Sequence, residues 1–207
     1  MITTIVFDIG NVLAEFPWRR YLHSFHFTEE TEERIAKALF MSDIWREADR
    51  GAMTDEEIFE TCRKEIPDLE KELKEVWEER IHIVKEFPDS VSWIKKLKEK
   101  GYRVYLLSNY AKTTFEEAIK CFEFLNYVDG RVISYEIKAI KPEKEIYEEL
   151  IQKYNVNPKE AVFLDDLVEN LEAAKKFGFA TILVQDREKA KEKLNLLLKE
   201  KGIVKRN

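Results

Sequence analysis

Short apolar runs separated by helical segments are the feature that most restricts the fold of this chain. Four such runs are rich in β-branched, aromatic or leucine residues: residues 2–7, 102–107, 161–164 and 180–184. Continuous apolar runs of this length are typical of parallel strands that are covered on both faces. Since helical patterns alternate with strand-like runs over residues 86–185, we predict an α/β fold, a doubly wound parallel sheet with a Rossmann-like core.

Several helices of this core have recognisable start or stop signals. Asp89 is a candidate N-cap for a helix that stops before Gly101, which suits the left-handed position after a helix end. Residues 157–160 combine Asn at the N-cap, Pro at the first helical position and Glu at the third, which predicts another helix start. Leucines at helical spacing predict a last helix over about residues 187–201.

The segment directly after the first strand has a different character. Residues 16–85 contain no strand-like run but several helical patterns, with starts at Thr28 and at Thr54, which opens a capping box. We therefore predict two parts: a helical-bundle insert over residues 16–85, which the family resemblance described below identifies as a cap, and the Rossmann-like core formed by residues 1–15 and 86–207.

Composition excludes several classes of protein. No apolar stretch approaches the roughly 20 residues that span a bilayer, and the apolar start of the chain meets Asp8 before it reaches the length of a signal peptide. The net charge is −6 with basic and acidic residues interleaved, which argues against a nucleic-acid partner. The two cysteines, Cys62 and Cys121, form no paired pattern, which is typical of reduced thiols and a cytoplasmic protein. We expect a monomer or a weak homodimer.

Polar residues follow the predicted strands where ligands bind to open parallel sheets, outside the carboxyl ends of the strands. Each has an ordinary explanation as a cap or turn residue, but together they bring carboxylates, a hydroxyl and a lysine to one edge of the sheet. Carboxylates hold Mg²⁺ through oxygen, a lysine and the cation neutralise a phosphoryl group, and an in-line carboxylate can attack phosphorus. These residues are Asp8, Ser108, Asn109, Lys141, Asp165 and Asp166.

Four runs containing these residues resemble the four motifs of the haloacid dehalogenase-like (HAD) hydrolases, in order and over about residues 1–185. The runs are FDIGNVL, LLSN, KAIKPEKEIY and VFLDDLVENLEAAKKFG. The resemblance is to the branch with a helical cap between the first two motifs. Within that branch, FDIGNVL and the cap stretch MSDIWREADRGAMTDEEIF look like the bacterial sugar-1-phosphate (α-D-glucose-1-phosphate) phosphatases.

The resemblance implies a role for each position. Asp8 is implied to be the nucleophile and a ligand of Mg²⁺, which Gly10 would also bind through its backbone carbonyl. Asp166 would bind the metal directly, and Asp165 would orient a metal-bound water or the lysine from beside it. The phosphoryl group would be held by Asn11, Ser108, Asn109 and Lys141.

Gly10 departs from the pattern of most phosphatases of this family. They carry a second aspartate at this position, which protonates the leaving oxygen and later activates water. General acid–base assistance is typically worth about 10²–10⁴ in rate, so three interpretations stay open. Another carboxylate replaces the aspartate, with Glu15 as the first candidate; or the substrate has a good leaving group, such as the anomeric oxygen of a sugar; or turnover is lost.

We therefore predict a Mg²⁺-dependent phosphatase that acts on a small phosphorylated metabolite, such as a sugar phosphate, through an aspartyl phosphate. One alternative is a 2-haloacid dehalogenase that uses the same Asp8 without metal; another is a non-catalytic protein that binds a phosphorylated ligand. Phosphonate-cleaving relatives need a cap lysine as an amine, and no cap lysine stands out. In the cap, the candidates for substrate contact lie around residues 45–51, above all Trp45, which could stack on a sugar, and Arg50, which could reach a phosphate or a hydroxyl.

Overall fold

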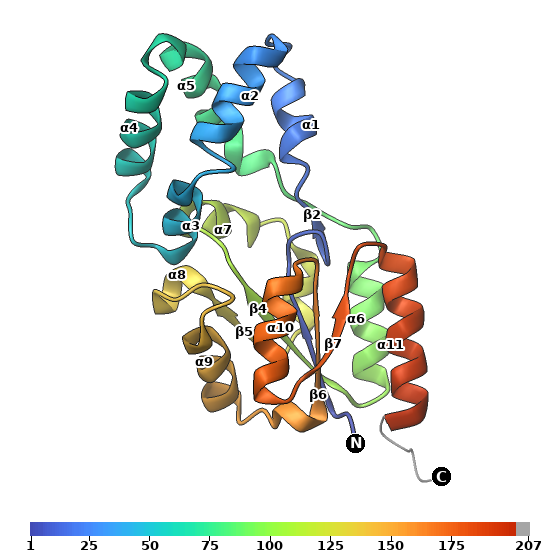
Figure 1. Ribbon diagram of the computed structural model, residues 1–207. Coiled ribbons are helices and arrows are strands. Elements are labelled where there is room, and N and C mark those ends of the chain that lie inside the picture. Colours follow the sequence, from blue (N-terminus) through green and yellow to red (C-terminus); the bar gives the residue numbers. More distant parts are fainter. Residues whose placement is uncertain (202–207) are drawn as a thin grey trace.

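The computed structural model describes residues 1–201 and contains a five-stranded parallel sheet in the order β5-β4-β1-β6-β7 (Figure 1). The fold is thus the predicted α/β sheet with a Rossmann-like order. Four strands coincide closely with the predicted runs, whereas β5 was not predicted. The strands are β1 (Thr4–Phe7), β4 (Arg103–Ser108), β5 (Gly130–Ile133), β6 (Ala161–Asp165) and β7 (Ala180–Leu183).

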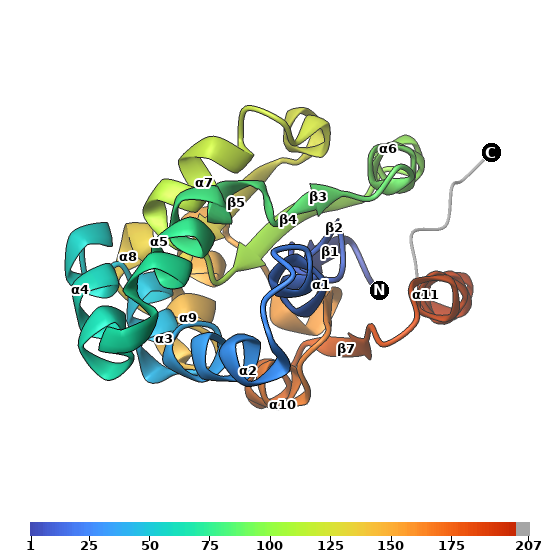
Figure 2. The same ribbon diagram turned by 90° about the horizontal axis from the view of Figure 1, so that it is seen from above.

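Side chains of the central strands alternate between two apolar layers. In β1, Ile5 and Phe7 pack in one layer and Val6 in the other, and all three are fully buried. Helices α6 (Ser90–Glu99) and α11 (Arg187–Lys201) cover the first face of the sheet, and α9 (Lys144–Tyr154) and α10 (Val168–Phe177) cover the second (Figure 2). Burial on both faces explains why these strands read as continuous apolar runs.

Two of the predicted helix signals act differently in the structure. Asp89 is the residue before α6, but its carboxylate makes no capping bond, because it pairs with Arg187 and Lys191 of α11. Residues 157–160 form only the short 3-10 helix η4 (Pro158–Glu160), which runs directly into β6. The remaining core helices are α7 (Lys112–Ala118), η3 (Glu123–Tyr127) and α8 (Ser134–Ile137). Within residues 1–201, no helix is long and apolar enough to cross a membrane.

A set of helices lies between two short antiparallel strands, β2 (Ala14–Glu15) and β3 (Lys85–Glu86). We call these helices the cap; they sit beyond the carboxyl ends of the sheet strands (Figure 1). The cap has its own apolar cluster, built on buried residues such as Ile35, Leu39 and Leu73. Its helices are α1 (Trp18–His23), α2 (Glu29–Ala38), α3 (Asp43–Arg50), α4 (Asp55–Glu65), η1 (Pro67–Leu69), α5 (Glu70–Glu79) and η2 (Arg80–His82).

The capping box at the start of α4 is present as predicted and gives a testable contribution to stability. The Thr54 hydroxyl accepts a hydrogen bond from the Glu57 backbone N–H at 3.2 Å, and Glu57 accepts one from the Thr54 backbone N–H at 2.8 Å. We expect Thr54→Ala to lower the free energy of unfolding by about 1 kcal/mol, because it removes an N-cap acceptor. Thermal or urea unfolding measures this. Thr61→Ala, at a half-buried position of the same helix whose hydroxyl donates to the Glu57 carbonyl, should change stability by no more than about 0.5 kcal/mol; equal losses for both variants would contradict the assignment.

Candidate active site

Three carboxylates meet at the carboxyl ends of the two central strands. Asp8 follows β1, and Asp165 and Asp166 lie at the end of β6, which pairs with β1. Each of the three offers a carboxylate oxygen, and these oxygens lie within 4.8 Å of one another. Parallel pairing alone accounts for the meeting, because it brings equivalent strand ends to the same edge of the sheet.

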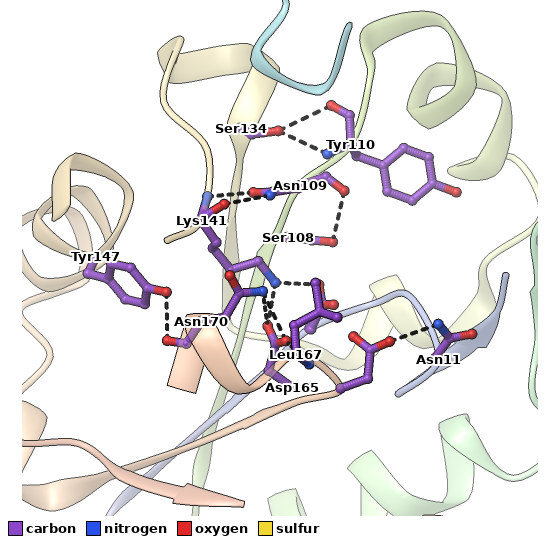
Figure 3. Close-up of polar contacts among 12 residues, drawn as sticks. Asn11, Ser108, Asn109, Tyr110, Ser134, Lys141, Tyr147, Asp165, Leu167 and Asn170 are labelled. Carbon is purple, nitrogen blue, oxygen red and sulfur yellow. Dashed lines mark hydrogen bonds and ion pairs between the residues drawn. The ribbon is translucent and has the colours of Figure 1, made fainter. Parts of the chain in front are cut away.

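Lys141 lies between two of these carboxylates. Its Nζ is 2.8 Å from Asp8 Oδ1 and 2.6 Å from Asp165 Oδ2, and only 1% of its side chain is exposed. Figure 3 shows the Lys141 side chain reaching toward Asp165. Burial by itself would lower the pKa of Lys141, but the charges of Asp165 and Asp8 outweigh it, so the pKa is raised. The lysine therefore stays charged and holds the two carboxylates together.

The pKa of the Asp8 carboxyl is raised to about 7. Burial is the largest cause; Lys141 opposes it, and the neighbouring charges of Asp165 and Asp166 add to it. The pKa of Asp166 is raised as well, chiefly by burial and against a hydrogen bond from Asn11. Clustered acids of this kind are disfavoured when all are charged, which is the electrostatic condition that attracts a cation.

The carboxylate of Asp165 is fully engaged by protein groups. It accepts hydrogen bonds from the Leu167 backbone N–H at 2.8 Å and from Asn170 Nδ2 at 3.0 and 3.1 Å, besides its ion pair with Lys141 (Figure 3). The backbone of Asn170 is fixed in turn by the Tyr147 hydroxyl. Asp165 thus orients Lys141, while Asp8 and Asp166 line the open cavity.

The residues expected to bind phosphate take different places. Asn109 uses both ends of its amide on the backbone of Lys141, donating at 3.0 Å and accepting at 2.7 Å, so it fixes the lysine's position (Figure 3). Ser108 is 1% exposed at the end of β4, and its hydroxyl lies 3.5 Å from the Asn109 carbonyl. Asn11 lines the cavity, and its amide donates to Asp166 at 2.8 Å and accepts from the Phe16 backbone at 3.2 Å.

A cavity of about 480 Å³ lies between this edge of the sheet and the cap. Its core side includes Asp8, Gly10 and Lys141. Aromatic side chains form part of the cap side, where Trp45 lines the cavity and stacks on Phe16 with ring centroids 5.8 Å apart. The cap side is completed by Arg46, Asp49, Arg80, Ile81 and Val84.

Four predicted residues are absent from the lining of this cavity: Ser108 and Asp165, which are buried at the ends of β4 and β6, and Glu15 and Arg50. Glu15 pairs with Arg20 at 2.7 Å, is about one-third exposed, and is absent from the described lining. Arg50 reaches Glu143 of the core with two hydrogen bonds of 2.6 and 2.7 Å. Glu15 thus lies outside the cavity lining with its carboxylate paired to Arg20, and Arg50 joins the cap to the core.

Within residues 45–51, Trp45 and Arg50 were singled out from the sequence, whereas the other polar cap residues that line the cavity, most notably Asp49, were not. The signal for it was present: Trp45 and Asp49 are four residues apart on α3 and therefore share one face of the helix. Arg50, one residue further, faces elsewhere. Tyr110 is also missed, although it directly follows the Ser108-Asn109 pair; it lines the cavity, and its buried hydroxyl has no hydrogen-bond partner within residues 1–201.

Comparison with known proteins relates this geometry to a family. The family model for haloacid dehalogenase-like hydrolases matches residues 2–178. D-ribitol-5-phosphate phosphatase of Bacteroides thetaiotaomicron is 28% identical over 215 residues, covering 96% of this chain and 99% of the relative. (S)-2-haloacid dehalogenase 4A of Burkholderia cepacia is 29% identical over 168 residues, covering 74% of this chain and 73% of the relative.

Solved structures share the fold. A HAD family enzyme of Bacteroides thetaiotaomicron, in complex with magnesium and inorganic phosphate, superposes with a TM-score of 0.69 at 24% identity, covering 88% of this chain and 94% of that one. L-2-haloacid dehalogenase from Xanthobacter autotrophicus gives a TM-score of 0.65 at 18% identity, with 87% and 76% covered. The motifs, the sheet order and the family match agree, and the chain belongs to the haloacid dehalogenase-like hydrolases.

Proposed function

We propose that this hydrolase is a Mg²⁺-dependent phosphatase that acts on a small phosphorylated metabolite, such as a sugar phosphate, through an aspartyl phosphate on Asp8. The observation that carries the proposal is the buried Lys141, held 2.8 Å from Asp8 and 2.6 Å from Asp165 at the floor of the cavity. Similarity to D-ribitol-5-phosphate phosphatase over almost the whole chain supports the substrate class.

The donor set fits a hard cation. Magnesium prefers oxygen ligands and is commonly held by one or two carboxylates together with substrate phosphate. Asp8 and Asp166 line the cavity, and Asp165 is occupied by Lys141. We propose that Asp8, Asp166 and the Gly10 carbonyl hold Mg²⁺, which would neutralise charge on the phosphoryl oxygens.

The residues of this chain then divide the work. Asp8 attacks phosphorus through a carboxylate oxygen, and the bond from phosphorus to the leaving oxygen breaks with its electron pair on that oxygen. Lys141 keeps Asp8 in place and adds a positive charge beside the transferring group. Asn109 keeps the backbone of Lys141 in position by hydrogen-bonding both its N–H and its carbonyl. The cap excludes water during transfer.

Assay of a panel of acyl, aryl and sugar phosphates with and without Mg²⁺ tests this proposal. We expect phosphate release that needs the cation and is lost with a chelator, because two clustered carboxylates repel a dianionic substrate without it. Absence of phosphate release from every ester, with folded protein and saturating Mg²⁺, would overturn the proposal.

Similarity to (S)-2-haloacid dehalogenase 4A supports dehalogenation as a second candidate function. Gly10 has no acid side chain, and a departing halide needs no proton. In that reaction Asp8 would attack carbon and displace halide. The same panel therefore includes 2-halo acids. Halide release that survives the chelator would favour this candidate, whereas cation-dependent phosphate release without halide release would exclude it.

A further inference from the structure

The position of Gly10 is open to the cavity and has no steric need for glycine. A Cβ atom placed on Gly10 would meet nothing closer than Asp8 Oδ2, at 4.0 Å. Its backbone also avoids the left-handed conformation that favours glycine, since Gly10 is not among the residues with positive φ. The core side of the cavity therefore has space for an acid side chain at position 10, but the residue there is a glycine.

Four carboxylates line the cavity in the described structure: Asp8, Asp49, Asp166 and Glu169. Asp8 and Asp166 form the floor, and Glu169 is an exposed residue of α10 on the core. Asp49 alone comes from the cap. In-line transfer to Asp8 requires the leaving oxygen on the opposite side of phosphorus, which is the side that the cap faces.

The part of α3 that carries Asp49 is fixed to the core on both sides of this residue. The Ser134 hydroxyl donates to the Asp49 backbone carbonyl, Arg50 binds Glu143 with two hydrogen bonds, and the Lys138 ammonium donates to the Gly51 carbonyl. Three successive residues of the cap are thus held by three different core side chains. Such contacts give a cap residue the positional precision that proton transfer needs.

We propose that Asp49 is the general acid and base of this site and replaces the side chain that Gly10 lacks; the proposal rests on the phosphatase function proposed above. Asp49 is partly buried and lines the cavity. Burial, and then the charge of Asp8, raise the pKa of the Asp49 carboxyl to about 7, against the opposing effects of Lys141 and a backbone hydrogen bond from Ala111. A carboxyl group with such a pKa supplies both the protonated and the ionised form near neutral pH.

Asp49 gives up one proton in the first chemical step and regains one in the second. When Asp8 forms its bond to phosphorus, the leaving oxygen takes the electron pair of the broken bond and the proton of the Asp49 carboxyl, and departs as an alcohol. The Asp49 carboxylate then takes a proton from a water molecule whose oxygen attacks the aspartyl phosphate. The bond to Asp8 breaks with its electron pair on the Asp8 oxygen, inorganic phosphate leaves, and Asp49 is again a carboxylic acid.

The neighbouring groups of the cavity suit this assignment. Tyr110, a core residue that lines the cavity, is 8% exposed, and its hydroxyl has no partner among the described residues, so the cavity offers a hydrogen-bond donor as well as the acid of the cap. The charge of Asp49 acts on this tyrosine, whose pKa is raised by burial first and then by Asp49 and Asp8. A phenol with a raised pKa stays protonated and can hydrogen-bond the leaving group without competing for its proton.

Single-turnover measurements on Asp49→Asn test the proposal by comparing substrates whose leaving groups differ in their need for a proton. With alkyl or sugar phosphates, whose leaving oxygens need a proton, transfer to Asp8 should slow by about 10²–10⁴-fold. With dinitrophenyl phosphate, whose leaving group needs none, the first turnover should be little changed. Because water activation is lost too, a burst of one equivalent of phenol should precede a slow steady state. A merely structural role would slow both substrates alike and give no burst.

Three variants serve as controls. Asp43→Asn makes the same chemical change on the same helix outside the cavity and should behave as the parent protein. Glu169→Gln removes the one cavity carboxylate to which no role is assigned among the described residues. It should show the same leaving-group dependence as the parent protein. Gly10→Asp in the Asp49→Asn background should recover at least about tenfold on sugar phosphates, because an acid is returned to the open core position.

The outcomes separate this inference from the function on which it rests. Mg²⁺-dependent phosphatase activity in the parent, with an unaltered leaving-group dependence and no burst in Asp49→Asn, would overturn the role of Asp49 and leave the proposed function intact. An altered leaving-group dependence and a burst in Glu169→Gln instead of Asp49→Asn would likewise overturn the role of Asp49 and leave the proposed function intact. Absence of phosphatase activity in the parent protein would instead overturn the proposed function itself.

Discussion

Asp8→Asn is expected to abolish turnover, with a loss of about 10⁴–10⁶-fold in kcat, as when the nucleophile of a covalent mechanism is removed. An amide is a poor nucleophile at phosphorus, and the substitution also takes one negative oxygen from the cation site. The fold should survive. Lys141 keeps Asp165 as a partner at 2.6 Å, so the buried ammonium stays paired, and the cost of ionising a group whose pKa is raised to about 7 disappears.

Two measurements check this expectation: kcat on the best ester at saturating Mg²⁺, and mass spectrometry of acid-quenched protein for a phosphoryl group on the peptide that contains Asp8. Glu172→Gln, which removes an exposed carboxylate paired with Lys175 on α10, is the matched control and should keep full activity. More than about a tenth of the parental kcat in Asp8→Asn, or a phosphorylated peptide elsewhere in the chain, would contradict the assigned nucleophile.

The core side of the site could be predicted from the sequence because parallel topology does most of the positioning. Once β1 and β6 are recognised as buried parallel strands, Asp8 and Asp166 must lie near each other. Strand β5 was missed because its four residues, Gly130–Ile133, include a glycine and an arginine, and only two are buried. The pairing of β2 with β3 was missed for a similar reason, since two residues carry no periodicity.

The cap side could not be predicted in the same way. Helical periodicity shows which residues of α3 share a face, but it does not show which face meets the core. That choice is made by long-range contacts, such as Arg50 with Glu143 and Ser134 with the Asp49 carbonyl. Arg50 was therefore expected in the cavity, and Asp49, on the face of Trp45, was not singled out from its neighbours. The contact of the Asn109 amide with the Lys141 backbone was not predicted for the same reason, because the two residues lie 32 positions apart in the chain.

Lys141→Met is expected to lower both activity and stability. The loss of stability is the more direct test of the buried ion pairs of Lys141. The substitution leaves Asp165, which is fully buried, and Asp8, which is 7% exposed, without their cation. Removal of one partner from a buried ion pair costs about 3–5 kcal/mol, because the remaining charge is left uncompensated. Urea unfolding without divalent cations measures this loss, and kcat should fall by at least about 10³-fold.

The surface pair of Lys175 and Glu172 provides a control of equal geometry. Its nitrogen–oxygen distance is 2.6 Å, the same as between Lys141 and Asp165, but its side chains are 51% and 57% exposed against 1% and 0%. Lys175→Met should therefore cost no more than about 0.5 kcal/mol. Similar losses for the two variants would mean that burial does not govern the contribution of Lys141.

Adding Asp165→Asn to Lys141→Met separates the electrostatic cause from lost packing. If uncompensated charge is the cause, the double variant should be more stable than Lys141→Met alone while remaining inactive, because one buried charge has gone. The defect of Lys141→Met should also shrink as pH falls. Since Lys141 opposes the effect of burial on the pKa of Asp8, its removal raises that pKa further above the value in the unfolded chain. The folded state then binds more protons, and stability decreases as pH rises. A defect that is independent of pH, with no recovery in the double variant, would instead show that Lys141 contributes through packing of its side chain.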